Sequence, residues 1–178
     1  FFATPLSRRD YLLGRFGGGF LASLAIMLVT ALGLWLGSQM PWLDQARLGP
    51  TPWAAYAWAF AVLVIPNLLF QAALLFTLAT LTRSMLYSYI GVVVFIVLWT
   101  MSGYRSRELD SRWIGALLDP SGVTAVGEYI RYWSSDQYNS QLPAVTGLLL
   151  GNRLLWLGVA AALLAAAFRL FRADREGI

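Results

Sequence analysis

Four long apolar stretches, separated by short polar segments, set the pattern of this chain. Each stretch approaches or exceeds the length of about 20 residues that an α-helix needs to cross the hydrocarbon core of a bilayer. We therefore predict an all-α membrane protein with four transmembrane helices. The predicted spans are residues 16–37, 53–81, 85–102 and 144–168.

The second span is longer than a straight crossing needs. It begins after Pro52, a residue typical of helix starts, and it contains Pro66, which removes one backbone donor from the helix. We expect a kink or a tilt at Pro66. Only Arg83 and Ser84 separate this span from the third, which predicts a tight turn between the two helices.

The segment 103–143 between the third and fourth spans is polar and charged, and it holds the turn dipeptides Asp119-Pro120 and Ser121-Gly122. Apolar residues recur every three or four positions on both sides of Pro120. Two short amphipathic helices are predicted, which either lie in the membrane interface or dip into the bilayer and return. Their apolar residues are Trp113, Ala116 and Leu117 in the first helix and Val123, Val126, Ile130 and Trp133 in the second.

Two polar residues, Asn152 and Arg153, interrupt the fourth span. The strictly apolar part, residues 154–168, is short for a crossing. Arg153 and Arg169 are expected to extend their long side chains toward opposite headgroup layers and so complete it. Anchoring at the interface is the first interpretation of Asn152 and Arg153, and an ionic contact inside the helix bundle is the second.

Two further polar residues, Asn67 and Gln71, lie four positions apart on one face of the second span. Polar side chains in a membrane helix seek hydrogen-bond partners on neighbouring helices. Buried bonding between helices is therefore the first interpretation of this pair. A polar stripe that faces a transported substrate is the alternative.

Glycines on and beside the first span form a separate set of candidates for helix packing: Gly14, Gly18, Gly33 and Gly37. Small residues at helical spacing allow another backbone to approach closely. Ordinary packing between helices accounts for them. The functional alternative is an interface with a second copy of the chain, or with a repeat, that slides during transport.

Composition agrees with a membrane protein and excludes several kinds of chemistry. Hydrophobic residues make up 58% of the chain and charged residues 12%, whereas soluble domains carry about 25% charged residues. The chain has no His and no Cys, which excludes the usual zinc sites and hydrolysis by a serine–histidine pair. Because it also lacks Lys, it contains no phosphate-binding loop for ATP hydrolysis. We expect no enzymatic activity, no metal, no cofactor and no nucleic-acid partner for this chain.

The distribution of arginine predicts the orientation, because every basic residue is an arginine. Four crossings place both ends of the chain on one side of the membrane, and that side has the larger number of arginines. Cytoplasmic segments are enriched in basic residues, so both ends are expected in the cytoplasm. The arginines on the same side as the two chain ends are Arg8, Arg9, Arg15, Arg83, Arg169, Arg172 and Arg175. Those on the other side are Arg47, Arg105, Arg107, Arg112 and Arg131.

Several segments have a familiar order: Thr4-Pro-Leu-Ser-Arg-Arg-Asp-Tyr-Leu-Leu-Gly-Arg-Phe16, then Pro66-Asn67-Leu-Leu-Phe, then Leu78-Ala-Thr-Leu-Thr-Arg-Ser-Met. With these segments the chain resembles the permeases of type-2 ATP-binding-cassette exporters. Through Leu118-Asp-Pro, Arg131-Tyr-Trp-Ser and Asn152-Arg-Leu-Leu-Trp-Leu-Gly it is similar, more narrowly, to bacterial permeases fused to a zinc aminopeptidase of the gluzincin type.

This resemblance implies a half-transporter of six spans, of which the chain holds the last four, in a bacterial inner membrane. It implies that residues 1–15 are a cytoplasmic coupling segment, that 103–143 is an external loop and that 169–178 is a cytoplasmic tail. The implied partners are a separate ATPase subunit, which holds ATP and Mg, and a second permease half or a homodimer. The coupling candidates are Leu6, Arg8, Arg9, Asp10 and Tyr11.

The sequence departs from the narrower resemblance, because the peptidase and two spans are missing and a chain without His has no zinc-binding motif. No peptidase activity is therefore expected. Two functions remain in view: a permease half, and a structural membrane anchor for a fused or associated peptidase domain. The basic residues before the first span also have two interpretations. They are suited to bind anionic membrane lipid, or, together with Asp10 and Tyr11, to bind in a groove of a partner protein. The transported substrate stays open.

Overall fold

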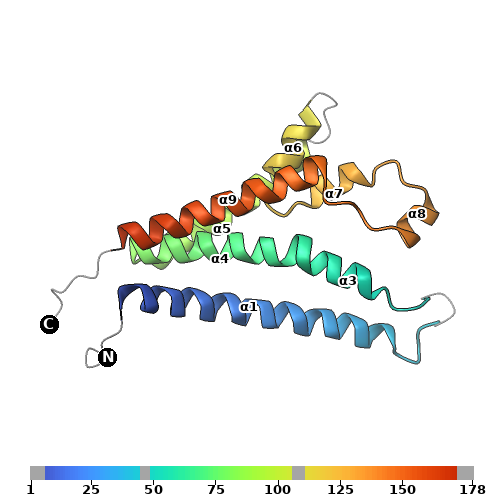
Figure 1. Cartoon of the computed structure of the whole chain (residues 1–178), viewed down its shortest axis with the longest axis horizontal. Helices are drawn as coiled ribbons and strands as arrows, with labels where there is room; N and C mark the ends of the chain where they lie inside the picture. The colour runs from blue at the N-terminus through green and yellow to red at the C-terminus, as the bar shows by residue number, and fades with distance from the viewer. Residues whose placement is uncertain (1–6, 45–48, 106–110, 172–178) are drawn as a thin grey trace.

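The structure of this protein is a computed structural model that describes residues 7–44, 49–105 and 111–171, without side-chain detail at positions 8, 85 and 105. Its described part consists of helices joined by short turns (Figure 1). The helices are α1 (Arg8–Ser38), α3 (Trp53–Ala59), the π-helix η1 (Phe60–Val64), α4 (Ile65–Thr82), α5 (Met85–Arg105), α6 (Arg112–Leu118), α7 (Val123–Tyr129), α8 (Ser135–Ser140) and α9 (Gly147–Leu170).

Four helical segments are long and apolar enough to cross a membrane: α1, the continuous α3–η1–α4, α5 and α9. They confirm the prediction of an all-α, multi-pass membrane protein. The start of α1, the end of α9 and the turn between α4 and α5 lie at one end of the molecule. The start of α3 and the helices α7 and α8 lie at the other (Figure 1). This arrangement is that of a chain that crosses four times.

The first span and the charged residues before it form one helix without a break, since α1 runs for 31 residues from Arg8. Ser7 caps its start: the Ser7 hydroxyl accepts a hydrogen bond from the Asp10 backbone N–H (3.2 Å) and donates one to the Asp10 carboxylate (2.6 Å). Such a cap satisfies a backbone donor that the first turn leaves unpaired. The charged end of α1 is therefore held rigidly to the membrane-spanning part.

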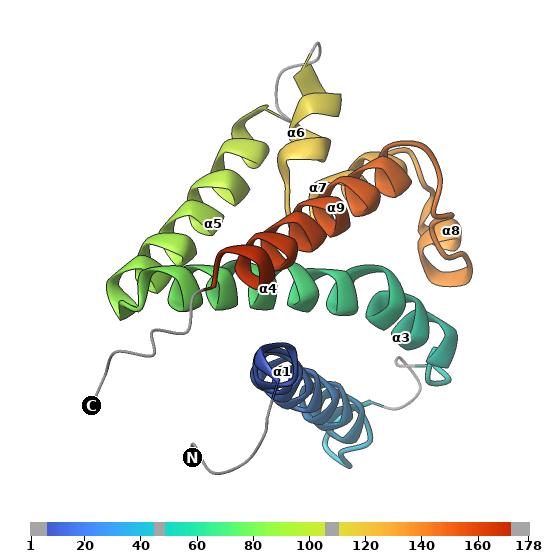
Figure 2. The same cartoon turned by 60° about the vertical axis from the view of Figure 1, so that its left-hand side comes forward.

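The irregularity expected at Pro66 is present, and it takes the form of the π-helix η1 just before the proline. In an α-helix the ring of Pro66 would clash with the carbonyl of Val62. That carbonyl lies in the wider π turn of Phe60–Val64, which leaves room for the ring. Pro66 itself stands in the first turn of α4, where a missing backbone N–H destabilises a helix little. Figure 2 shows α3 turning away from the line of α4.

The tight turn predicted between the second and third spans is confirmed. Arg83 adopts the left-handed conformation (φ 53°) and ends α4, with its backbone N–H bonded to the carbonyl of Ala79 (3.1 Å). The Ser84 hydroxyl then accepts a hydrogen bond from the backbone N–H of Leu86 (3.3 Å), in the first turn of α5. Two residues suffice to reverse the chain.

The core lies where α4 packs against α9. Ala73 and Ala160 are fully buried there, because small residues let two helix backbones approach. Phe70 and Trp156 meet edge to face, with ring centroids 4.7 Å apart. The Thr77 hydroxyl, buried at the same interface, donates to the carbonyl of Leu163 (3.0 Å). These two spans form the centre of the bundle.

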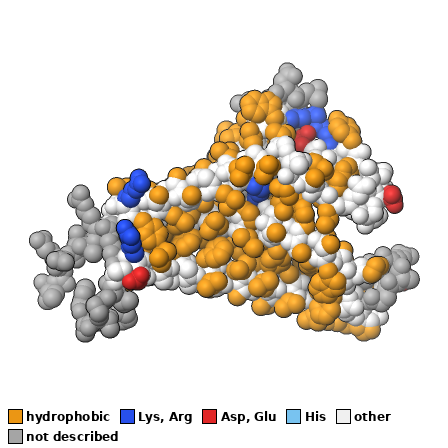
Figure 3. Space-filling model, in the orientation of Figure 1, with side chains coloured by type: hydrophobic (Ala, Val, Ile, Leu, Met, Phe, Trp, Pro, Cys, Tyr) orange, Lys and Arg blue, Asp and Glu red, His pale blue; other side chains and the backbone are white. Residues whose placement is uncertain are grey.

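The first helix, α1, lies beside this core. Leu12 is its one buried residue among those described, and Phe16 packs on the core cluster. Much of the remaining surface of α1 is apolar and exposed, as at Val29 (67% exposed) and Leu34 (66%). Apolar side chains likewise cover the middle of the molecule in Figure 3, between charged ends. Such a surface fits lipid as the surrounding solvent.

The loop 103–143 holds three short helices in its described residues, α6, α7 and α8, where two were predicted. The second predicted helix is shorter than expected: α7 ends at Tyr129, and Trp133 bonds back to Ile130 in a turn. The periodicity of apolar residues does not predict α8, because the start of this helix depends on polar residues. Ser134 and Gln137 form a reciprocal capping box there. Whether these helices lie in the membrane interface stays a prediction.

The placement of the two ends of the bundle can be tested by thiol labelling, because the chain has no Cys. Ser7 and Ser135 are both exposed and lie at opposite ends. In cells we expect Ser135→Cys to react with a membrane-impermeant reagent and Ser7→Cys to react only after the membrane is opened. Equal reaction at both sites would contradict the four-span arrangement, and the reverse pattern would contradict the predicted orientation.

Candidate functional site

A cluster of buried and half-buried polar side chains connects α4 and α9 to the turn between α6 and α7. We call Asn67, Asp119, Ser121, Asn152 and Arg153 the polar cluster. Asn152 and Asp119 are completely buried, and Arg153 is 4% exposed. Polar groups of this kind destabilise the fold when they are buried without hydrogen-bond partners. The hydrogen bonds of each member therefore indicate the role of the cluster.

Arg153 is the residue on which the cluster converges. Its Nε and Nη2 atoms both donate to the Oδ1 atom of Asn152, the former at 2.9 Å. Nη1 donates to Asn67 Oδ1 of α4 (2.8 Å), and Nη2 donates to the carbonyl of Pro120 in the turn (3.3 Å). The predicted anchoring of Arg153 in a headgroup layer is therefore wrong, because its guanidinium finds its partners inside the bundle.

The side chains of Asn152 and Trp156 donate hydrogen bonds to carbonyl groups at the end of α6. The last carbonyls of a helix have no partner within the helix. Asn152 Nδ2 donates to the carbonyls of Ala116 (2.6 Å) and Asp119 (2.7 Å), and Trp156 Nε1 donates to that of Leu117 (2.9 Å). Side chains of α9 thus complete the hydrogen bonding of a separate short helix.

Asp119 caps the next helix. One carboxylate oxygen accepts from the backbone N–H and the hydroxyl of Ser121 (2.8 and 2.6 Å), and the other accepts from the backbone N–H of Thr124 (2.8 Å) in the first turn of α7. The carboxylate also attracts Arg153 electrostatically. Asn67 completes the arrangement by donating from Nδ2 to the carbonyl of Ser121 (2.9 Å).

The sequence pattern predicts Asp119 as a turn residue and does not indicate this capping role. The signal was present in Asp119-Pro120-Ser121-Gly122, since Asp and Ser side chains in such turns often bond to the backbone that follows them. Burial beneath α9 is not visible in that pattern, because it depends on residues more than 30 positions away.

Gly122 lets the turn approach Arg153 closely. Its backbone is left-handed (φ 74°), and a Cβ atom added there would overlap the guanidinium of Arg153. Glycine therefore meets two requirements at once, the backbone conformation and the space.

Gln71 does not join the polar cluster, although it was predicted together with Asn67. It is half-buried and lines a small cavity of about 90 Å³ between α4 and α5, with Gly91 and Phe95 among its neighbours. The interpretation as buried hydrogen bonding therefore fits Asn67. For Gln71 the substrate-facing alternative stays a prediction.

The predicted packing glycines face open space within the described part of the chain. A Cβ atom added at any of them would have no neighbouring atom within 4 Å. An interface with a second copy or a repeat stays a prediction for these residues, which are Gly14, Gly18, Gly33 and Gly37.

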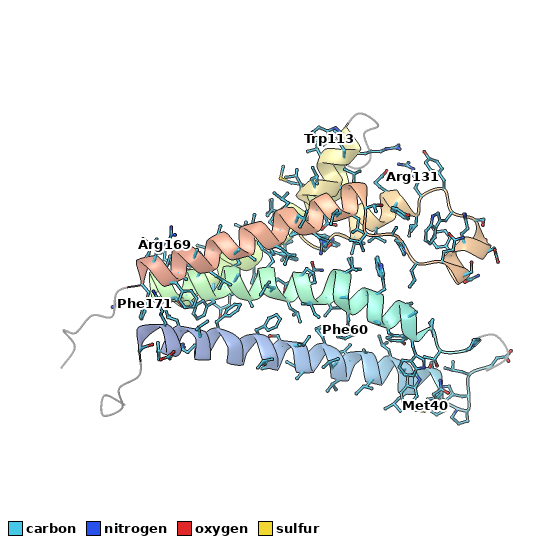
Figure 4. All side chains as sticks on the ribbon, in the orientation of Figure 1. Met40, Phe60, Trp113, Arg131, Arg169 and Phe171 are labelled. Carbon is cyan, nitrogen blue, oxygen red and sulfur yellow. The ribbon has the colours of Figure 1, made fainter. Side chains whose placement is uncertain are left out.

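The coupling candidates lie at the start of α1, except Leu6, which is outside the described residues. Arg8 is the first residue of the helix, and Arg9, Asp10 and Tyr11 are exposed. The Tyr11 hydroxyl accepts a hydrogen bond from Arg15 (2.9 Å), and its ring stacks on Phe171 after α9, with centroids 6.5 Å apart. Figure 4 labels Phe171 beside the start of α1.

Chemically, the cluster positions helices. Its donors and acceptors satisfy one another and the backbone of α6 and α7. Among the residues that the structure describes, no group of three or more metal-binding side chains is placed to hold a metal ion. Compared with known proteins, the chain matches no family model, no curated protein and no solved structure.

Replacing Asn67 by Leu, which has a similar size, should destabilise the bundle. The change removes the acceptor for Arg153 Nη1 and the donor for the carbonyl of Ser121. Leaving such buried groups unpaired costs about 1–3 kcal/mol. Gln71→Leu, one turn away on the same helix, is the matched control and should cost less. Reversible unfolding of the full chain in detergent measures both changes, and equal losses would show that the cluster contributes no specific stability.

Gly122→Ala tests the approach of the turn to Arg153. The left-handed backbone alone should cost about 1–2 kcal/mol with a Cβ atom present, and the overlap with the guanidinium adds to this. Gly127→Ala is the control, since Gly127 lies inside α7 with open space around it, and Ala favours a helix. We expect a lower melting temperature and faster proteolysis near residue 122 only in Gly122→Ala. Unchanged melting in that variant would refute the close approach.

Proposed function

We propose that this chain is the membrane-spanning permease part of an ATP-binding-cassette exporter, driven by a separate ATPase subunit. The observation that carries the proposal is α1, one uninterrupted helix that joins the exposed charged residues Arg9 to Tyr11 to a membrane span. A partner that changes shape with nucleotide can displace a span only through a stiff connection of this kind. The resemblance to type-2 exporter permeases supports the same role.

The packing supplies a route for such a displacement. Leu12 is buried at the charged end of α1, and Tyr11 stacks on Phe171 after α9. At its other end α9 carries Asn152 and Arg153, which hold the turn between α6 and α7. A push on the start of α1 would therefore reach α9 and the short helices through contiguous contacts, which is what coupling between distant sites requires.

The charge distribution supports a cytoplasmic location for this end of α1 in a bacterial inner membrane. Arg9, Arg15, Arg83 and Arg169 lie at the end where α1 begins, with Asp10 as the described acid. The opposite end carries Asp44, Glu128 and Asp136 beside Arg112 and Arg131. Basic residues favour the cytoplasmic side. In this role the chain performs no catalysis: ATP and Mg²⁺ bind to the ATPase, and transport alternates the exposure of a path shared with a second permease half.

Photo-crosslinking tests the proposal directly. A photoreactive amino acid at position 10 of the full-length protein should cross-link to an ATPase subunit in intact cells, because the Asp10 side chain is exposed at the charged end of α1. Mass spectrometry identifies the partner by its nucleotide-binding sequence. The matched control is position 132, where Tyr132 is 87% exposed at the opposite end of the bundle.

A product with an ATPase at position 10 and none at position 132 is the expected result. Cross-linking at position 10 to a peptidase domain alone would favour the alternative of a structural membrane anchor. A complete lack of protein cross-links at position 10 would contradict the coupling role.

A further inference from the structure

A second site lies between the start of α1 and the end of α9, at the opposite end of α9 from the polar cluster. The two helix ends enclose a hollow of about 450 Å³ lined by Ser7, Arg9, Leu12, Phe168 and Arg169. Two positively charged side chains thus come to one hollow from different helices. Among its described lining residues, none is acidic.

Neither Arg9 nor Arg169 forms a hydrogen bond or an ion pair with another described residue. Other arginines outside the spans are engaged: Arg15 bonds to the hydroxyl of Tyr11 (2.9 Å), and Arg131 pairs with Glu128 (3.2 Å). The Asp10 carboxylate accepts the hydroxyl hydrogen of the lining residue Ser7 (2.6 Å) and forms no ion pair with Arg9 or Arg169. The hollow therefore carries two guanidinium groups available to an anion.

The base of the hollow is apolar. Leu12 is 1% exposed, and Phe168 is half-buried. Guanidinium groups bind phosphate oxygens through paired hydrogen bonds, whereas the exposed part of Phe168 offers a surface for hydrocarbon. A cationic rim over an apolar base matches the boundary between the headgroup and the acyl chains of a phospholipid.

The hollow also lies at the level where such a boundary is expected. Arg9 opens the first span, and Arg169 stands in the last turn of the fourth. Figure 4 labels Arg169 at this end of α9. Anionic lipids are attracted to arginines just outside a membrane span. Inorganic phosphate carries the same oxygens but gains nothing from the apolar ring of Phe168.

We propose that Arg9 and Arg169 bind the phosphate of an anionic phospholipid whose acyl chains begin against Phe168. The lipid would bridge α1 and α9. Arg9 lines the hollow and is also a coupling candidate, but the two proposals are tested separately, because the lipid measurement contains no ATPase and the cross-linking position is the neighbouring Asp10. A result that contradicts one of the two proposals therefore does not contradict the other.

Thermal unfolding of the full chain in a neutral detergent tests the site. Short-chain phosphatidylglycerol should raise the melting temperature in a saturable manner, and phosphatidylcholine of the same chain length should not. In the double variant Arg9→Gln with Arg169→Gln the apparent affinity for phosphatidylglycerol should fall about 30-fold, the loss of two arginine contacts of the strength usual near an anionic membrane surface.

The matched control is Arg15→Gln with Arg83→Gln, which removes the same charge from the same end but leaves the lining of the hollow intact. It should keep the affinity within about threefold of the original, as removal of screened surface charges does. An equal loss of affinity in both double variants would show that general electrostatic attraction explains the binding, and would contradict the proposed site. So would the same response to phosphatidylcholine, the same response to inorganic phosphate, or the absence of any response to phosphatidylglycerol in the unaltered chain.

Discussion

The need to pair every polar group of a broken backbone, in a molecule whose surroundings are mostly lipid, governs the arrangement of this fold. A helix that crosses a membrane satisfies its own backbone, but a turn between two short helices does not. Here α6 ends and α7 begins against two spans, and the partners come from Asn152, Trp156 and Asn67. The position of α9 is thus fixed both by apolar packing on α4 and by the carbonyls that it must satisfy.

Much of the fold follows from the sequence, because hydrocarbon thickness gives each apolar run a required length. The spans, the tight turn at Arg83 and the break near Pro66 are all local consequences of residue type. The pairing of the polar cluster is not local. Arg153 has a side chain long enough either to reach a headgroup layer or to turn inward, and only the three-dimensional position of Asn67 and Pro120 decides between them.

The two ends of α9 therefore have different physical characters. At one end, the amides of Asn67 and Asn152, the guanidinium of Arg153 and the carboxylate of Asp119 bond to one another or to the backbone. At the other end, the ring of Phe171 stacks on Tyr11, and the exposed Arg9 and Arg169 line a hollow. One helix thus joins an end that holds the short helices in place to an end with exposed charged groups.

The π-helix Phe60–Val64 has a consequence for the aromatic contacts at the other end of α1, where the ring of Trp35 meets Trp53 with centroids 5.6 Å apart. A π turn accommodates one residue more than an α turn, and each residue rotates a helix by about 100°. Removing one residue from this stretch would let it close into an α turn, which leaves α3 on the same face but brings the carbonyl four residues back onto the ring of Pro66. The π turn therefore allows Pro66 to stand in this helix while Trp53 keeps its contact with Trp35.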